Sequence, residues 1–214
     1  MGAIYRFNLV ELIEKFNIEY FVETGTLYGE GVEYARKSTG GAFKEIHSIE
    51  ILDDLYENAA NKYSSVADVH IHHGRSVDVL EDIITNLDGN ILFWLDAHYP
   101  GADIGRKSYH QPDIEEKEVL PLETELEIIK KVRNKHRDVI ICDDLWLYED
   151  GIYGSDAGTL DNHLKLHCNG ETKEQIGKPN ANFLNELWEE THEIVKMRED
   201  QGYAAIIPKE KNRI

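Results

Sequence analysis

Acidic side chains follow the apolar runs of this sequence at the points where strands would end. They are Glu23, Glu50, Asp96, Asp143 and Asp144. Ligands of an open α/β sheet collect beyond the carboxyl ends of its strands, so these carboxylates would face one crevice. Three ionised carboxylates held close together need a cation, and oxygen ligands suit Mg²⁺ or Mn²⁺. The pattern therefore predicts a divalent-metal site formed by Asp96, Asp143 and Asp144.

His98 lies two residues after Asp96 and can titrate near neutral pH. It is a candidate base for deprotonating a metal-bound hydroxyl, and Asp144 is the alternative base if it is not a ligand. Plainer alternatives stay open. Asp96 could cap the following turn, and His98 could be an ordinary loop histidine. Asp143 and Asp144 could form a solvated loop pair.

A glycine-punctuated turn follows the first apolar run, within residues 20–35. Gly25, Gly29 and Gly31 recur where side chains would obstruct a tight turn, and the helix that begins there directs free N–H groups at whatever lies over the turn. The spacing differs from the dinucleotide fingerprint Gly-x-Gly-x-x-Gly, which makes a nicotinamide enzyme the second choice. A generic strand-turn-helix connection is the alternative to a cofactor site.

The run Glu23-Thr-Gly25-Thr-x-x-Gly29-x-Gly31 resembles motif I of class I S-adenosylmethionine-dependent methyltransferases. The resemblance implies that Glu23 lies near the methionine portion of the cofactor and that the glycine turn passes beneath it. Glu50 follows Glu23 by 27 residues, where a carboxylate can accept hydrogen bonds from both ribose hydroxyls. A solvated carboxylate before a helix is the alternative for Glu50. The cofactor-binding residues implied by the resemblance are Glu23, Thr24, Gly25, Thr26, Gly29, Glu50, Ser76 beside the adenine, and Asp96.

The two acidic clusters resemble those of metal-dependent O-methyltransferases, including the catechol type and the macrolide and aminocoumarin sugar enzymes. In that group an aspartate after the fourth strand and an acidic or amide pair after the fifth strand hold the ion. Asp96 and the pair Asp143 and Asp144 match those positions. The catechol-type enzymes use a lysine near the position of His98, and the next lysine along this sequence is Lys107. This departure leaves the base open between His98 and Asp144.

The elements that would position these residues alternate along the chain. Two runs, 90–96 and 138–143, are nearly continuous in apolar residues, as strands covered on both faces require, and they are predicted to be adjacent central strands. The alternation predicts an α/β fold with a doubly wound, mostly parallel Rossmann-like sheet and helices on both faces, for which the resemblance implies seven strands. The other strands are expected at 20–23, 45–50, 69–73, 194–197 and 203–207, and helices near 9–16, 53–63, 78–87 and 122–136.

Composition fits a single domain over residues 1–214, since 41% of the residues are apolar. The formal net charge of −18 argues against a nucleic-acid partner, because phosphate binding draws on clustered Lys and Arg. Cys142 and Cys168 form neither a disulfide framework nor a Cys-x-x-Cys metal motif, which favours a reducing compartment. No apolar run approaches the ~20 residues that span a bilayer, so we expect a soluble, cytoplasmic protein without a membrane partner.

Two long polar stretches, 99–121 and 148–179, follow the predicted central strands and are expected to build an acceptor pocket. Their hydroxyl, carboxylate and aromatic groups favour a sugar or another polyhydroxylated small molecule. The sequence thus predicts an S-adenosylmethionine-dependent O-methyltransferase, assisted by a divalent metal, with a small-molecule or glycan acceptor. The alternatives are a metal-dependent hydrolase, a nicotinamide oxidoreductase and a catalytically inactive cofactor-binding module. The oligomeric state, a homo-oligomer included, stays open.

The remaining histidines receive no catalytic role. His70, His72 and His73 alternate around the strand at 69–73 without a nearby carboxylate in the sequence, and we interpret them as strand and edge residues. His163 and His167 have the spacing of helical metal ligands but no third ligand nearby, and we interpret them as one face of a helix.

Overall fold

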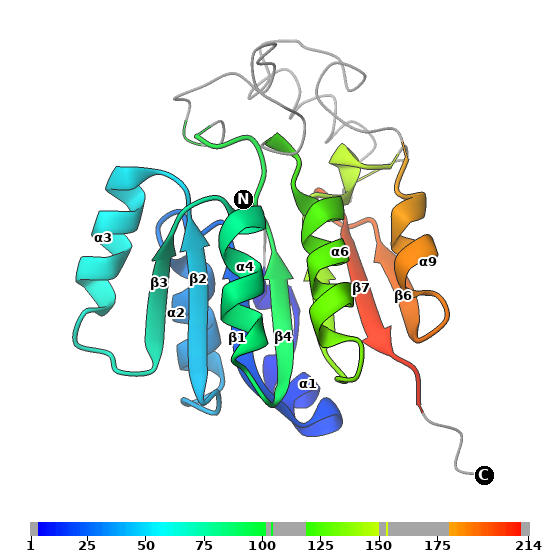
Figure 1. The fold of residues 1–214 in the computed structure, drawn as a ribbon, viewed down its shortest axis with the longest axis horizontal. Helices are drawn as coiled ribbons and strands as arrows, with labels where there is room; N and C mark the ends of the chain where they lie inside the picture. The colour runs from blue at the N-terminus through cyan, green and yellow to red at the C-terminus, as the bar shows by residue number, and fades with distance from the viewer. Residues whose placement is uncertain (1–3, 102–103, 105–118, 150–152, 154–179, 211–214) are drawn as a thin grey trace.

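Seven strands form a single sheet in the order β3-β2-β1-β4-β5-β7-β6 (Figure 1). The computed structural model describes residues 4–101, 104, 119–149, 153 and 180–210. Strands β1 to β5 run parallel, β7 is antiparallel to β5, and β6 is antiparallel to β7. This arrangement confirms the predicted seven-stranded, mostly parallel sheet. The strands are β1 (Ile18–Thr24), β2 (Glu45–Glu50), β3 (Val69–His73), β4 (Asn90–Leu95), β5 (Val139–Cys142), β6 (His192–Met197) and β7 (Tyr203–Pro208).

The two most apolar strands, β4 and β5, are neighbours, as their sequences predicted. Leu95 pairs with Cys142 in the parallel register, and the backbone N–H of Asp143 donates to the Leu95 carbonyl at 3.0 Å. The ends of the two strands therefore lie at the same edge of the sheet. This register brings the acidic residues that follow β4 and β5 into one region.

Helices cover both faces of the sheet, which confirms the doubly wound α/β fold. On the face toward the viewer in Figure 1, α4 (Ser76–Thr85), α6 (Leu122–Arg133) and α9 (Asn182–Trp188) pack on the sheet. On the other face, α1 (Leu9–Phe16), α2 (Glu30–Ser38) and α3 (Asp53–Tyr63) bury their apolar sides. Two short 3₁₀ helices, η1 (Ile4–Arg6) and η2 (Leu145–Leu147), complete the described elements. Helix α4 begins at Ser76 rather than at residue 78, since the chain leaves the extended conformation at Arg75.

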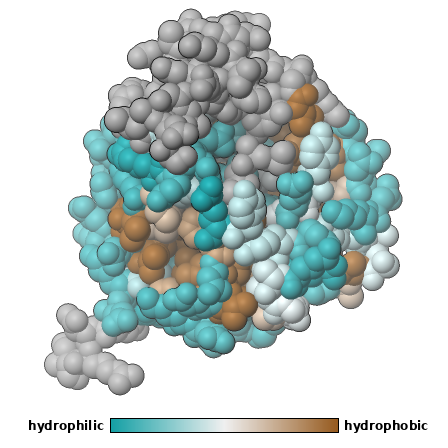
Figure 2. Space-filling view, turned by 180° about the vertical axis from the view of Figure 1, so that it is seen from behind, coloured by the Kyte–Doolittle hydropathy of each residue, from teal (hydrophilic) through white to brown (hydrophobic). Residues whose placement is uncertain are grey.

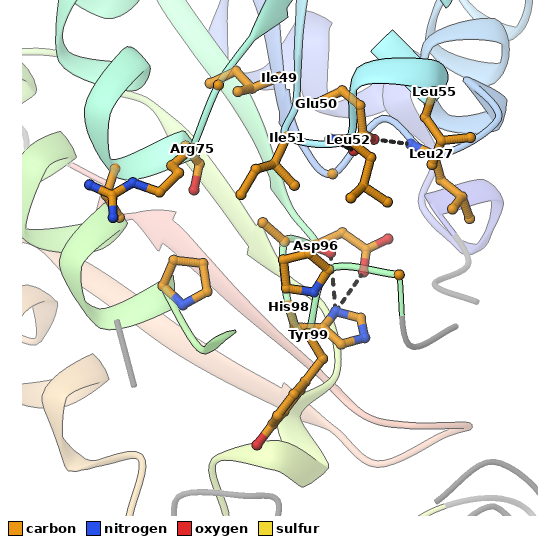
Figure 3. Close-up of a pocket in the computed structure, with 18 residues that line it drawn as sticks. Leu27, Ile49, Glu50, Ile51, Leu52, Leu55, Arg75, Asp96, His98 and Tyr99 are labelled. Atoms are coloured by element: carbon orange, nitrogen blue, oxygen red, sulfur yellow. Dashed lines mark hydrogen bonds and ion pairs between the residues drawn. The ribbon is translucent and has the colours of Figure 1, made fainter. Parts of the chain in front are cut away.

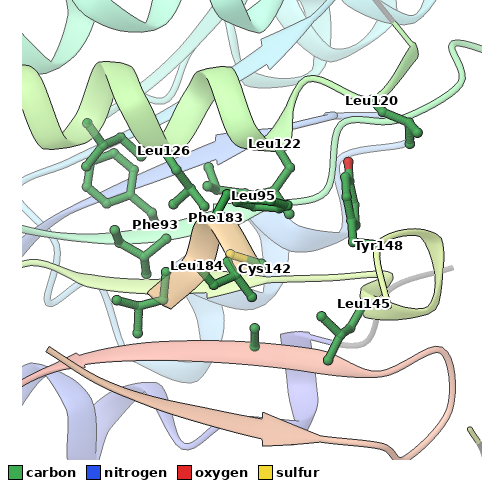
Figure 4. Close-up of a cluster of buried hydrophobic side chains, with 14 of the residues drawn as sticks. Phe93, Leu95, Leu120, Leu122, Leu126, Cys142, Leu145, Tyr148, Phe183 and Leu184 are labelled. Carbon is green, nitrogen blue, oxygen red and sulfur yellow. The ribbon is translucent and has the colours of Figure 1, made fainter. Parts of the chain in front are cut away.

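The core between the sheet and α6 fixes the ends of β4 and β5. Figure 4 shows Phe93, Leu95 and Cys142 from these strands facing Leu126 of α6 and Leu184 of α9. All five side chains are buried. The burial of these side chains stabilises the ends of β4 and β5 that carry the site, because each fully buried apolar side chain contributes about 1.5–3 kcal/mol.

A buried ion pair fixes the opposite end of the same two strands. Arg133, the last residue of α6, contacts Asp138 through its Nε and Nη2 atoms, each at 2.9 Å. Asp138 in turn accepts the backbone N–H of Ile91 at 2.7 Å, so α6, β4 and the start of β5 meet at one carboxylate. Breaking a buried pair of this kind leaves an uncompensated charge, which is strongly destabilising.

The rear face is partly apolar. Figure 2 shows hydrophobic residues gathered over the half of that face that holds β7 and β6, with polar residues around them. Val195 of β6 is 38% exposed. Among the described residues, no helix has the length and apolar character needed to cross a membrane.

Candidate active site

A cavity of about 830 Å³, its open mouth included, lies at the carboxyl ends of the parallel strands (Figure 3). This is the position at which ligands bind in open α/β sheets. Its walls come from the turn after β1, the segments after β2 and β3, and the loop after β4. The residues predicted from sequence that line it are Gly25, Glu50, Ser76, Asp96 and His98.

The glycine turn approaches the β4 loop at van der Waals distance. Gly25 has a φ of +87°, and a Cβ placed there would lie 2.8 Å from the carbonyl oxygen of Asp96. Gly29 caps α2 in the left-handed conformation with a φ of +73°. Gly25 is therefore required both by its close contact with the β4 loop and by its backbone conformation. Gly29 is required by its conformation. Gly29 itself does not line the cavity.

Glu23 supports the turn from below and does not line the cavity. Its carboxylate accepts the Ser48 hydroxyl at 2.7 Å, and Ser48 lies 2.6 Å from the hydroxyl of Thr26. A side chain at Gly31 of α2 would collide with this carboxylate. Burial raises the pKa of Glu23 to about 8. Glu23 and Thr26 are thus buried beneath the turn and linked through Ser48, whereas the buried Thr24 hydroxyl donates to Glu125 of α6 at 3.5 Å.

Glu50 ties two walls of the cavity together. One carboxylate oxygen accepts the backbone N–H of Leu27 at 2.8 Å, and the other accepts that of Leu52 at 2.9 Å. Burial raises the pKa of Glu50, and these hydrogen bonds counter the effect. Each carboxylate oxygen has two acceptor positions, so hydrogen bonds from a ligand can add to the backbone contacts.

Three apolar side chains that were not predicted from the sequence form a wall of the cavity beside Glu50. Ile51, Leu52 and Leu55 line the cavity (Figure 3). Gly74 and Ser76, which follow β3, also line the cavity. The apolar side chains that come directly after Glu50 were the available signal for this wall.

An acidic and histidine cluster adjoins the cavity. Asp96, His98 and Asp144 each offer one ligand atom, and these atoms lie within 4.8 Å of one another. The Nε2 atom of His98 is 3.1 Å from Asp144 Oδ2, and its Nδ1 atom is 3.2 Å from the Asp96 carbonyl oxygen. The cluster differs from the predicted metal set in one member: His98 occupies the place expected for Asp143.

Two tryptophans hold the carboxylates of this cluster. The indole N–H of Trp146 donates to Asp144 Oδ1 at 3.0 Å, and that of Trp94 donates to Asp96 Oδ2 at 3.3 Å. The sequence carried a signal for both contacts, because a tryptophan lies two residues before Asp96 and another two residues after Asp144. The indoles fix the orientation of both acids.

Asp143 lies next to the cluster, and its Oδ1 accepts the backbone N–H of Asp144 at 2.7 Å. Its Oδ2 is buried and has no hydrogen-bond partner within the part of the chain that the structure describes. Burial raises the pKa of Asp143 well above its ordinary value, and the charges of Asp96 and Asp144 add to the effect. Asp143 lines a hollow of about 200 Å³ that adjoins the cluster.

Glu125 of α6 is a further buried acid in this hollow, and it was not predicted from the sequence. Burial raises its pKa to about 7, while hydrogen bonds from Ser76 and Thr24 lower it. Its Oε1 has no partner among the described residues. A glutamate on the apolar stripe of α6, between Leu122 and Leu126, was the available signal.

Most of the predicted acceptor pocket lies outside the described residues. Of the stretches 99–121 and 148–179, the structure places Tyr99, Pro100, Gly101 and Pro121 in the cavity wall. Tyr148 lines the smaller hollow. His163, His167 and Cys168 fall outside the described ranges.

Solved structures of methyltransferases share this fold over almost the entire chain. No protein-family model and no curated protein matches the sequence. The SAH-bound methyltransferase PaMTH1 of Podospora anserina superposes with a TM-score of 0.61 at 16% identity, covering 98% of this chain and 80% of that one. A Staphylococcus aureus protein described as a caffeoyl-CoA O-methyltransferase gives 0.59 at 14% identity, covering 98% and 85%.

The O-methyltransferase TomG of Streptomyces achromogenes, involved in tomaymycin synthesis and solved with SAM, gives a TM-score of 0.53 at 14% identity, covering 98% of this chain and 82% of that one. Identities this low establish the fold alone. The chain has the fold of the class I S-adenosylmethionine-dependent methyltransferases, as its glycine turn and strand alternation predicted.

Proposed function

We propose that this protein is an S-adenosylmethionine-dependent O-methyltransferase that orients its acceptor hydroxyl with a divalent cation. The observation that carries the proposal is the sharing of residues between the two parts of the site. Asp96 and His98 line the large cavity and also belong to the cluster with Asp144. A cofactor in the cavity and an acceptor at the cluster would therefore meet at Asp96.

The cavity walls suit each part of the cofactor. Glu50 offers carboxylate oxygens to the ribose hydroxyls, and the apolar wall of Ile51, Leu52 and Leu55 offers a surface for the adenine ring. Gly25 allows backbone to approach the methionine portion closely. The solved relatives PaMTH1 and TomG hold SAH and SAM, which supports the same ligand here.

The hydrogen bonds and the donor atoms of the cluster are those expected of a cation site. Histidines that bind metals usually donate their other ring N–H to a carbonyl or carboxylate, and His98 Nδ1 lies 3.2 Å from the Asp96 carbonyl oxygen. Nε2 then offers its lone pair beside Asp144. Asp143 lies beside this cluster, and its buried Oδ2 has no hydrogen-bond partner among the described residues, which leaves it available to a bound group. A donor set with one imidazole suits Mn²⁺, Fe²⁺ or Zn²⁺ better than Mg²⁺, which prefers oxygen ligands.

This geometry favours His98 as a ligand over His98 as the base. Both ring nitrogens face protein groups, Nδ1 the Asp96 carbonyl and Nε2 the Asp144 carboxylate. A cation held between Nε2 and the Asp144 carboxylate would occupy the lone pair that a base needs, so His98 could not serve as the base while it binds the ion. Asp96 and Asp144 would hold the cation together with His98, and the cation would lower the pKa of the acceptor hydroxyl.

The other role of the protein is to align the methyl group of the cofactor with the acceptor oxygen. S-adenosylmethionine bound in the cavity would supply the methyl group: the acceptor oxygen would bond to the methyl carbon as the carbon–sulfur bond breaks, the electron pair of that bond would stay on sulfur to give S-adenosylhomocysteine, and the hydroxyl proton would pass to solvent water. The rigid β1 turn and the carboxylates oriented by Trp94 and Trp146 would hold the two reactants in line. The polar residues of 99–121 and 148–179 support a sugar or another polyhydroxylated acceptor.

The experiment that tests this function measures transfer of a labelled methyl group from S-adenosylmethionine to a panel of free and nucleotide-linked sugars. We expect turnover that chelation abolishes and Mn²⁺ restores, while SAH still binds the chelated protein. Asp144→Asn should lose turnover, and the exposed Asp88→Asn serves as the matched control. Turnover that survives exhaustive chelation would refute the cation, and failure to bind either SAM or SAH would refute the methyltransferase.

A further inference from the structure

Three histidines and a glutamate gather on β2 and β3, on the face of the sheet that also carries α4. Glu45 and His47 come from β2, and His70 and His72 from β3. Alternate residues of a strand share a face, and His47 pairs with His70 across the parallel register. In Figure 1, β3 lies at the left end of the sheet, with no helix of the described chain drawn in front of it.

The side chains of this histidine cluster contact one another directly. His47 Nε2 lies 3.0 Å from Glu45 Oε2, and His47 Nδ1 lies 3.0 Å from His72 Nε2. The ring of His47 stacks on those of His70 and His72, with centroid distances of 4.9 and 5.3 Å. The carboxylate that the neighbouring sequence lacks is thus supplied across the sheet by the adjacent strand.

We propose that Glu45, His47 and His70 form a second metal site, for a transition-metal ion of the Zn²⁺ or Cu²⁺ class. One ligand atom from each of these residues lies within 4.8 Å of the others. Two imidazoles and a carboxylate match the ligands that such ions take, and the Glu45 side chain, 44% exposed, gives water access as a further ligand. The site is separate from the acidic cluster at the ends of β4 and β5.

His72 would act as a positioning residue in this site. Ligating histidines are oriented by a hydrogen bond from their other ring nitrogen, and His47 Nδ1 faces His72 Nε2. With His47 Nδ1–H donating to His72, the lone pair of His47 Nε2 is directed toward Glu45. Burial lowers the pKa of His47, and it lowers that of His72 to about 4, so both imidazoles are neutral at physiological pH. Neutral imidazole is the form that binds metals.

The position along the strand separates this site from the methyl-transfer chemistry. His47 precedes Glu50 by three residues on β2, which corresponds to roughly 10 Å of strand. Glu45, His47 and His70 do not line the cofactor cavity. A bound ion would instead join β2 to the edge strand β3. Its expected effect is a higher melting temperature rather than a change in turnover.

The test is titration of the intact, chelator-treated protein with Zn²⁺, followed by calorimetry, and with Co²⁺, followed by its visible absorption. His73→Ala is the matched control, because His73 lies on the same strand but stacks on Tyr56 and pairs with Asp53 on the opposite face. We expect wild type and His73→Ala to bind one ion more than His70→Ala. His70→Ala, which removes a metal ligand, should lower the Zn²⁺ affinity of this site more than tenfold, and His72→Ala should lower it about 10–100-fold.

Glu45→Gln provides a second variant that keeps the side-chain shape, since Glu45 is largely outside the core, with its side chain 44% exposed. It should reduce Zn²⁺ affinity while leaving SAH affinity and Mn²⁺-dependent turnover unchanged. Equal stoichiometry and affinity in wild type, His70→Ala and Glu45→Gln would overturn the proposal. Because turnover is measured on the same variants, failure of this site and failure of the proposed methyl transfer are distinguishable.

Discussion

Glu23 should make the stability of this protein fall as the pH rises through the neutral range. Its carboxyl group is buried beneath the glycine turn, and burial raises its pKa to about 8 from an ordinary value of 4.5. Between these two values the folded protein binds a proton that the unfolded chain releases. The stabilising contribution is therefore fully present below pH 4.5 and is lost as the pH rises toward 8.

The magnitude follows from the linkage relation. Within this window each pH unit changes the free energy of unfolding by about 1.4 kcal/mol, so the change from pH 5 to pH 8 is about 4 kcal/mol at most. Glu23→Gln replaces the carboxyl group with a neutral group of similar shape. The variant should lack this part of the pH dependence, and its stability relative to wild type should rise steadily across the window.

Urea unfolding of both proteins at pH 5, 6, 7 and 8 measures the difference. Other titrating groups cancel in the comparison, because they are common to the two proteins. Glu57→Gln, at an exposed position of α3, is the control and should track wild type at every pH. A difference between Glu23→Gln and wild type that stays constant from pH 5 to pH 8 would refute the argument, since it would mean that Glu23 is ionised in the folded state.

Three further outcomes are expected. Glu50→Gln should weaken SAH binding at least tenfold in calorimetry, since a neutral amide replaces acceptors for ribose and for two backbone N–H groups; an unchanged affinity would contradict the ribose role. Trp146→Phe should lower Mn²⁺ affinity about 10–100-fold by freeing the Asp144 carboxylate, and equal Mn²⁺ titrations would exclude an orienting role. Gly31→Ala should reduce the free energy of unfolding by about 1–3 kcal/mol, because its methyl group meets Glu23, and a melting temperature equal to wild type would show that this contact relaxes freely.

The sequence was informative about the sheet because its signals there are local. The runs 90–96 and 138–143 are apolar enough that only strands covered on both faces accommodate them, and the structure has β4 and β5 there as neighbours. Because parallel strands end at the same edge of the sheet, the acidic residues that follow them lie near one another. Glu50, Ser76 and Asp96 consequently lie in the cavity wall.

The metal cluster could not be derived fully, since it depends on the directions of two consecutive side chains. Asp144 has a left-handed backbone conformation with a φ of 51°, and its Oδ2 lies 3.1 Å from His98 Nε2, whereas Asp143 Oδ1 accepts the backbone N–H of Asp144. No spacing in the sequence predicts such a turn at an aspartate. The histidine cluster was missed for a related reason, because Glu45 meets His70 only through the register of two strands separated by a helix.

The contact between Gly25 and the Asp96 carbonyl would couple the two proposed binding events through the backbone as well as through the side chains that they share. The turn that would receive the cofactor also hydrogen-bonds to β2 through Gly25 N–H and Ile49 O, while Asp96 N–H donates to Thr24 O. A ligand that moves this turn must therefore move the backbone that carries Asp96 and His98. Thermodynamic reciprocity then requires that any factor by which the cation changes SAH affinity equals the factor by which SAH changes cation affinity. Gly25 would thus transmit free energy between the proposed cofactor site and the proposed cation site.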